Sequence, residues 1–347
     1  MRDSGKHLPT LLLWPGTFLV ALLSSLIFSW AYWQNAIPAE AAPRNLTTIS
    51  TSIEPIIPIP LAIPGLDKAK ANLGNRLFHE TRLSGNGSVA CANCHPLDQG
   101  GADHKLHRAG TDNASGLINT LSVFNCGFNF RQFWDGRAAT LEEQINGPLT
   151  HPLEMDSSWE LAVSRLRSDP TYLAAFAASY ADGITPDNIR NAIATFMRSL
   201  VTPNSRFDKY LRGDKQAINP EELAGYNLFN SYGCINCHQG VNVGGNMYEK
   251  LGVMLEYFKG ETDIKRADMG RYATTRIPEH LYEFKVPGLR NVAVTAPYFH
   301  NGSVTRLDQA VAVMGKYQLG LELPLEDIDR ITAFLRTLTG EYNGRPL

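Results

Sequence analysis

The chain has 347 residues, of which 44% are hydrophobic and 19% are charged, a composition that excludes a fully disordered protein. This length is enough for two domains that each bury a core of their own. The 32 basic residues nearly balance the 34 acidic ones, for a formal net charge of −2, so the charge gives no reason to expect nucleic acid as a partner.

An apolar segment lies near the start of the chain. Residues 11–33 are mostly apolar, no charged residue occurs between positions 8 and 39, and Arg2 and Lys6 precede the segment. About 20 apolar residues can cross a bilayer, and the positive flank stays on the cytoplasmic side. We therefore expect residues 1–37 to be either a membrane anchor or a signal peptide cut near residues 39–41, with the rest of the chain exported.

A proline-rich stretch follows over residues 38–65. Proline at this density cannot continue a helix and favours extended polyproline geometry. We interpret the stretch as a tether that holds the body away from the membrane, with an arm lying along the domain surface as the alternative. Its prolines are Pro38, Pro43, Pro55, Pro58, Pro60 and Pro64.

Helical signals dominate from residue 66 onward, and strand signals are few and short. We expect a mainly α fold. Helices are predicted to begin at Ser158, Thr185 and Asn219, at a sequence resembling a capping box over residues 305–308, and at Leu325 in an amphipathic stretch that ends at Gly340.

A loose internal repeat spans the body. Each copy has a Leu-Phe pair, then the pattern C-x-x-C-H, then a Gly-Gly pair, and the pattern occupies residues 91–95 and 234–238. The copies lie about one domain length apart. We predict an N-terminal domain over residues 66–213 and a C-terminal domain over residues 214–347.

The repeated pattern is typical of covalent haem attachment. Its two thiols can form thioethers with the haem vinyl groups, and the histidine that follows becomes the proximal iron ligand. A zinc site would need two further ligands per motif, and a redox dithiol would need no histidine. We therefore expect two haem c groups, held by Cys91, Cys94 and His95 and by Cys234, Cys237 and His238. The remaining Cys126 is expected to be a small buried residue.

Over residues 64–340 the chain resembles the bacterial dihaem cytochrome c peroxidases and their relatives, the MauG type of dihaem oxidase. The resemblance implies two cytochrome c-like domains, each around one haem c. The matching segments are residues 73–84, 133–137, 143–144, 152–155, 286–291 and 295–300.

The resemblance assigns the iron ligands position by position. His95 would serve the N-terminal haem, where peroxide reacts, and His238 would serve the C-terminal haem together with Met314. The MauG type has tyrosine at the position of Met314, so the methionine favours the peroxidase type. Three other methionines match no family position: Met247, Met254 and Met269.

The resemblance also suggests residues for proton and electron transfer. Glu154 would move a proton between the two peroxide oxygens, with Gln144 as a polar partner in the same pocket. Trp134 would lie between the two haems and pass electrons. A calcium ion between the haems would take its ligands from three residues: Asn119, Thr295 and Pro297.

The chain departs from many family members at one position. Those members hold a second histidine over the N-terminal haem, and the corresponding residue here is Thr111. Either His104 or His107 replaces that histidine, or the iron keeps an open sixth position. We favour the open site.

We thus predict a periplasmic peroxidase that reduces hydrogen peroxide to water with electrons from a small cytochrome c or copper protein. It would be tethered to the inner membrane if residues 11–33 are retained. A MauG-like oxidase that modifies a partner protein and a non-catalytic dihaem electron carrier are the alternatives. The sequence leaves a homodimer open.

Overall fold

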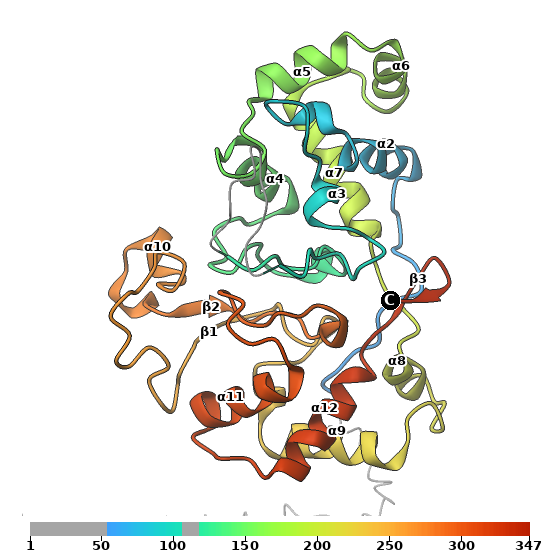
Figure 1. The fold of residues 1–347 in the computed structure, drawn as a ribbon. Helices are drawn as coiled ribbons and strands as arrows, with labels where there is room; N and C mark the ends of the chain where they lie inside the picture. Colours follow the sequence, from blue (N-terminus) through green and yellow to red (C-terminus); the bar gives the residue numbers. More distant parts are fainter. Residues whose placement is uncertain (1–53, 106–117) are drawn as a thin grey trace, which may run out of the picture. The chain divides into compact units, whose positions relative to one another are not determined.

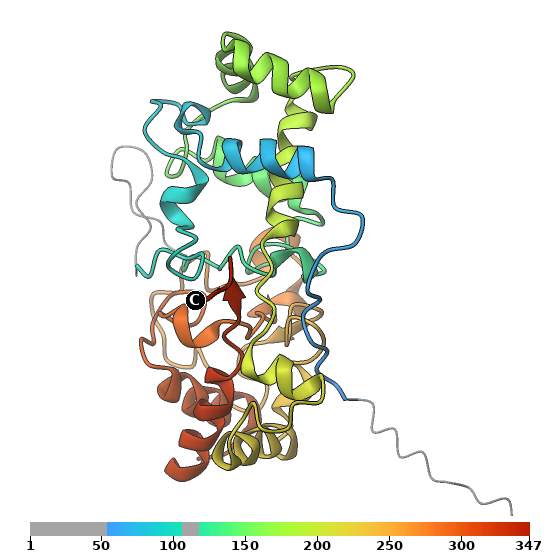
Figure 2. The same cartoon turned by 90° about the vertical axis from the view of Figure 1, so that its right-hand side faces the viewer.

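Helices make up most of the regular secondary structure in this computed structural model, which describes residues 54–105 and 118–347 (Figures 1 and 2). The predicted mainly α fold is confirmed. The first half contains α2 (Lys68–Phe78), α3 (Cys91–Cys94), α4 (Leu141–Thr150), α5 (Trp159–Arg167), α6 (Pro170–Ser179) and α7 (Pro186–Ser199). The second half contains α8 (Arg206–Leu211), α9 (Pro220–Ser231), α10 (Tyr272–Thr275), α11 (Leu307–Leu319) and α12 (Leu325–Arg336). Short 3-10 turns cover Thr81–Leu83, Cys126–Phe128, Cys234–Asn236, Pro278–His280 and Val292–Val294.

Strands are short in the described residues. β1 (Tyr248–Lys250) pairs antiparallel with β2 (Glu283–Lys285), with Tyr248 opposite Lys285. β3 (Glu341–Tyr342) and β4 (Arg345–Pro346) form a second antiparallel pair.

The first core is organised by the pairing of α2 with α7, against which α4 also packs (Figure 1). Gly74 of α2 lies so close to α7 that a Cβ there would stand 2.6 Å from the carbonyl carbon of Ala192. Next to this contact, the rings of Phe78 and Phe196 meet edge to face at 5.3 Å. The close crossing depends on the missing side chain of the glycine.

The second core repeats this device with α9 and α12. A Cβ on Gly225 would stand 2.5 Å from the carbonyl carbon of Arg330, and the rings of Phe229 and Phe334 are 5.2 Å apart. The internal repeat read from the sequence is therefore also a repeat of helix packing. Phe207 of α8 precedes the boundary predicted at residue 213 but packs in this second core.

Most predicted helix starts are confirmed. The side chains of Ser158, Thr185 and Asn219 each accept a hydrogen bond from a backbone N–H of the first turn. The capping box predicted over residues 305–308 is wrong. Helix α11 begins at Leu307 with Arg306 as its N-cap residue, and it has no side-chain cap because a guanidinium can only donate. Arg306 Nε instead binds the Asp308 carboxylate at 3.0 Å. Helix α12 ends at Arg336, before the end predicted at Gly340.

Residues 54–65 form an arm along the body, the alternative to the tether. Ile56 and Ile59 are buried, and Gly240 N donates to Pro55 O at 2.8 Å. Residues 38–53 and the apolar segment 11–33 lie outside the described residues. Within residues 54–105 and 118–347, no helix has the length and apolarity to cross a membrane.

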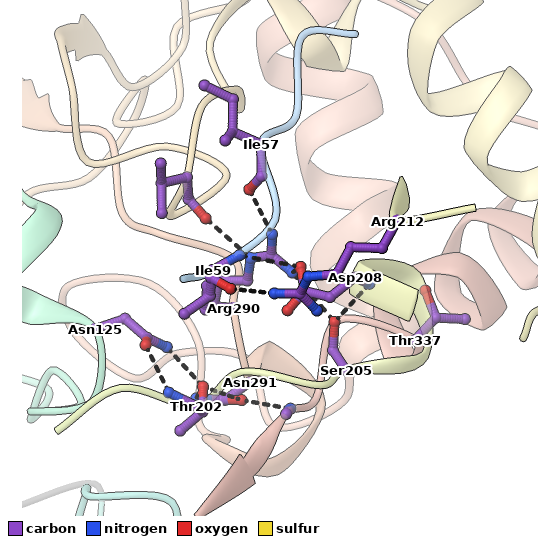
Figure 3. A network of polar contacts seen from close by, with 12 residues as sticks. Ile57, Ile59, Asn125, Thr202, Ser205, Asp208, Arg212, Arg290, Asn291 and Thr337 are labelled. Carbon is purple, nitrogen blue, oxygen red and sulfur yellow. Dashed lines mark hydrogen bonds and ion pairs between the residues drawn. The ribbon is translucent and has the colours of Figure 1, made fainter. Parts of the chain in front are cut away.

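A buried ion pair fixes this arm (Figure 3). Arg290 and Asp208 are 2.8 Å apart, with side chains 1% and 0% exposed. Arg290 also donates to Ile57 O at 3.0 Å, and Asp208 accepts from Ile59 N at 3.3 Å. Burial lowers the pKa of Arg290, and the carboxylate of Asp208 opposes that shift. The charged pair therefore holds the arm through its backbone.

A second polar contact in Figure 3 joins three loops. Asn125 Nδ2 donates to the hydroxyl of Thr202 at 2.8 Å, and Asn291 Nδ2 donates to the same hydroxyl at 3.0 Å. All three side chains are buried. They connect the loop after the first C-x-x-C-H motif, the segment after α7 and the loop before α11.

Candidate functional site

The first cavity lies at α3, which carries the first C-x-x-C-H motif. It has a volume of about 140 Å³, and Cys91, Cys94 and His95 line it. The Nδ1 atom of His95 faces the carbonyl oxygen of Gly101 at 3.0 Å. A carbonyl only accepts, so Nδ1 carries the proton and Nε2 is the nitrogen presented to a metal. This tautomer suits a proximal haem ligand.

The second cavity is larger, about 400 Å³, and is lined by Cys234, Cys237 and His238. Burial lowers the pKa of His238 to about 4, so its ring is neutral at neutral pH. Its Nδ1 is buried and has no hydrogen-bond partner among the described residues. A neutral ring beside an apolar cavity is what an iron ligand requires.

The cysteines of both motifs lie in apolar surroundings. Burial raises the pKa of Cys91 to about 12 and that of Cys234 to about 11, so both are neutral thiols. Zinc binds thiolates, and no group of three His, Cys, Asp or Glu side chains suited to a metal occurs in the part of the chain that the structure describes. The residues therefore fit thioether bonds to haem better than a zinc site.

Trp134 lines both cavities. Its ring is 9% exposed, and its Nε1 donates to the backbone oxygen of Asn119 at 2.9 Å. The edge of the ring meets His300 at a centroid distance of 6.4 Å, and His300 Nε2 lies 2.7 Å from Asp268 Oδ1. The indole is thus held in one orientation at a position that borders both cavities. The other residues that line both cavities are Asn119, Leu121, Ser122 and Asn129.

A tight loop over residues 133–137 positions Trp134. Gly136 has a φ of +65°, and a Cβ there would overlap the phenol of Tyr248. The Arg137 guanidinium lies 3.4 Å from the centroid of the Phe133 ring and 2.9 Å from Asp135 Oδ1. Phe133 and Arg137 also line the first cavity. Sequence reasoning assigned them no role, although both stand in the motif that identified Trp134.

Glu154 and Gln144 both line the first cavity, together with His95. Gln144 lies on α4, and Glu154 lies half-buried in the turn that follows. Glu154 N donates to His151 O at 2.9 Å, and Gly85 N donates to Met155 O at 2.7 Å. These backbone bonds fix the turn, so the two predicted pocket residues are brought together.

Met314 of α11 lines the second cavity with His238. It is the one methionine among the described residues to do so. Met254 is 60% exposed at the surface, and neither Met247 nor Met269 reaches the cavity. The arrangement suits a thioether ligand at the second iron.

The three residues predicted for calcium all line the second cavity. Asn119 Nδ2 donates to Pro297 O at 2.7 Å and to Phe299 O at 3.0 Å, while the Thr295 hydroxyl donates to Val292 O at 3.3 Å. Oxygen atoms therefore converge at Asn119. A cation would need the amide turned so that Oδ1 faces the carbonyls.

The candidate sixth ligands divide into described and undescribed residues. His104 Nδ1 lies 2.9 Å from Ala296 O, and its Nε2 lies 2.6 Å from Gln99 O. Both ring nitrogens face carbonyl oxygens, and His104 does not line the first cavity. It is not placed to bind the iron. His107 and Thr111 lie outside the described residues.

Two C-x-x-C-H motifs, each with its histidine lining a mainly apolar cavity, define a protein that carries two haem c groups. Residues 68–216 match the sequence profile of the family described as "Di-haem cytochrome c peroxidase". The chain is 45% identical to the cytochrome c peroxidase Ccp of Escherichia coli (strain K12) over 317 residues, which cover 91% of this chain and 67% of that protein. It is 44% identical to the cytochrome c551 peroxidase of Nitrosomonas europaea over 289 residues, 83% of this chain and 85% of that protein. The chain belongs to the di-haem cytochrome c peroxidase family.

Among solved structures, a MauG-like protein associated with microbial copper homeostasis is similar, with a TM-score of 0.71 and 28% identity. The similarity covers 82% of this chain and 95% of that one. This likeness extends through both predicted haem c domains.

Proposed function

We propose that the chain is a cytochrome c peroxidase that reduces hydrogen peroxide to two molecules of water, consuming two protons and two electrons. The observation that carries this proposal is the composition of the first cavity. Glu154 and Gln144 line it together with His95, and His95 is the one histidine among its described lining residues. A carboxylate that can move protons and an amide that can orient peroxide therefore line the same cavity as His95.

The proposed chemistry divides between the haem and the chain. The haem supplies the iron-centred electron transfer that breaks the O–O bond. Glu154 takes a proton from one peroxide oxygen and returns it to the other as the bond breaks. Gln144 orients the peroxide through its amide. His95 stays in one tautomer because the carbonyl of Gly101 holds its Nδ1 proton.

The second site receives electrons and passes them on. His238 and Met314 would hold its iron, and a thioether ligand raises the reduction potential, which suits an electron acceptor. Trp134 is the one aromatic residue among the described residues that lines both cavities, so it can connect them for electron transfer. Calcium at Asn119, Thr295 and Pro297 would stiffen the same junction.

The electron donor is a small cytochrome c or copper protein in the periplasm. This location follows from the apolar segment 11–33 with its positive flank and from haem attachment at both motifs. Retention of that segment would tether the enzyme to the inner membrane. We also propose that the chain can form a homodimer, which a measurement of its mass in solution would test.

Oxidation of reduced small cytochrome c by hydrogen peroxide tests this function. We expect turnover by the wild type and a fall of about 10²- to 10⁴-fold in Glu154→Gln, with the haem spectrum retained. Asp156→Asn is the matched control, because Asp156 lies two residues away, is exposed and does not line the cavity. Equal activity in the two variants would refute the role of Glu154.

A resting-state EPR spectrum tests the open sixth position. We expect one high-spin ferric signal from the first site and one low-spin signal from the second. Two low-spin signals would show that a residue outside the described part, such as His107, occupies the first iron.

A MauG-like oxidase is the second candidate, favoured by the similarity to a MauG-like solved structure at 28% identity. Met314 argues against a MauG-like oxidase, since the MauG type has tyrosine at this position. Peroxide-dependent modification of a partner protein, without donor-coupled turnover, would decide for this alternative.

A further inference from the structure

Lys285 is a buried cation at the junction of the two haem sites. It ends β2, its backbone N–H donates to Trp134 O at 2.8 Å, and the residue lines the second cavity. Only 1% of Lys285 is exposed. Burial lowers the pKa of its ammonium to about 8, which leaves the group mostly protonated at neutral pH.

The charge of Lys285 has no partner within the described residues. No side chain there hydrogen-bonds to its ammonium or forms an ion pair with it. Cys126 is close enough to affect its charge, but burial raises the pKa of that thiol to about 12, so it supplies no anion. An ammonium buried without a partner is strongly unfavourable.

The other charged residues around the second cavity are accounted for. Arg290 lines it but is paired with Asp208 at 2.8 Å. Glu249 is the one carboxylate among the described lining residues. It lies opposite Phe284 in the β1–β2 register, so its side chain points to the other face of the ladder from Lys285. The described residues thus supply no anion for Lys285, and a group that enters the cavity can supply one.

We propose that Lys285 is the counter-charge for a propionate of the haem held by Cys234, Cys237 and His238. Haem carries two carboxylates on one edge, and they are the anions that such a cavity would receive. The ammonium would neutralise one of them beside Trp134, where electrons leave the second site. Lys285 is then a positioning residue that sets the reduction potential of that haem. The inference rests on haem attachment at this motif, as the proposed function does, but not on peroxide reduction.

A redox titration of the haem-loaded protein tests the proposal. Lys285→Gln leaves the propionate uncompensated, and its negative charge favours the ferric iron. We expect the reduction potential of the second haem to fall by more than the spread of replicate titrations. Lys285→Arg, which keeps the charge, should restore most of that potential. Lys250→Gln is the control, since Lys250 lies on the same two-stranded sheet but is exposed.

Resonance Raman spectroscopy provides a readout that a purely structural role would not change. The propionate-bending band should shift in Lys285→Gln and Lys285→Arg, while the bands that report axial ligands stay in place. If Lys285→Gln does not fold, the shift in Lys285→Arg decides.

Unchanged potentials and an unchanged propionate band would overturn the proposal. So would a shift as large in Lys250→Gln. Absorbance of haem c and donor-coupled turnover are measured on the same samples. If the wild type lacks either the haem c absorbance or the turnover, the proposed function is wrong. If the wild type has both and only the Lys285 variants show no change in potential or propionate band, this inference alone is wrong.

Discussion

The close crossing of α2 and α7 at Gly74 gives a stability prediction that can be worked out from the coordinates. Gly74→Ala would place a Cβ 2.6 Å from the carbonyl carbon of Ala192 and 2.8 Å from the Cβ of Phe196. Ordinary van der Waals contact begins at 3.4 Å. The carbonyl oxygen of Ala192 lies closer still, so the two helices must separate by more than about 0.8 Å, enough to lose about half of the dispersion energy along the contact.

Overpacking of this kind costs about 1–3 kcal/mol, and backbone on the opposing side puts Gly74 at the top of that range. Alanine recovers about 1 kcal/mol through its better helix propensity. The net loss of about 2 kcal/mol corresponds to a fall of about 4–8 °C in the unfolding temperature of a domain of this size. Far-UV circular dichroism of the haem-loaded protein measures it.

The neighbouring substitution Asn75→Ala serves as the control for Gly74→Ala. Asn75 lies on the same helix with its side chain exposed, so the change should stay within about 0.5 kcal/mol. Gly225→Ala should repeat the effect of Gly74→Ala in the second core. Unfolding of Gly74→Ala at or above the wild-type temperature would refute the packing argument.

Three further outcomes follow from other parts of the structure. Asp208→Asn should destabilise the protein by about 3–5 kcal/mol in chemical denaturation, because it leaves Arg290 buried and unpaired; a loss below 1 kcal/mol would contradict this. Met314→Ala should open the second iron to added imidazole, seen as a change in absorbance that the wild type lacks, and equal imidazole binding by both proteins would count against Met314 as a ligand. The pKa of Glu80 is lowered, chiefly by hydrogen bonds from Arg82. This pair therefore stabilises the fold at pH values above the unfolded-state pKa of about 4.5, and the stabilisation is lost as the pH falls through the lower pKa of the folded state. The difference in unfolding temperature between wild type and Glu80→Gln should accordingly narrow between pH 7 and pH 3, and a constant difference would exclude the linkage.

Local chemistry made much of this fold predictable. The N-caps at Ser158, Thr185 and Asn219 act on their own first turns, so sequence alone locates them. The C-x-x-C-H motifs carry all their chemistry within five residues. The same reasoning fails at α11, because the helix begins one residue later than predicted and Arg306 at the N-cap has no acceptor for the first turn.

Contacts between distant parts of the chain cannot be predicted from this sequence alone. Nothing in the pattern pairs Arg290 with Asp208 or buries Lys285 without a partner, since both depend on how the loops close in three dimensions. The joint position of Trp134, Gln144 and Glu154 came from family resemblance rather than from spacing. The proline-rich sequence fits both a tether and an arm, because proline density determines local conformation and not which residues the segment contacts.

The arm also bears on the order in which the protein is assembled. Ile57 accepts its hydrogen bond from Arg290, 233 positions later in the chain. During synthesis, residue 57 is made long before its partner exists, so the arm cannot close until most of the polypeptide has been produced. Until then the flank of residues 234–238 stays uncovered beside Gly240. Enclosure of the second motif by the arm therefore depends on residue 290 being in place, although the motif itself is complete at residue 238.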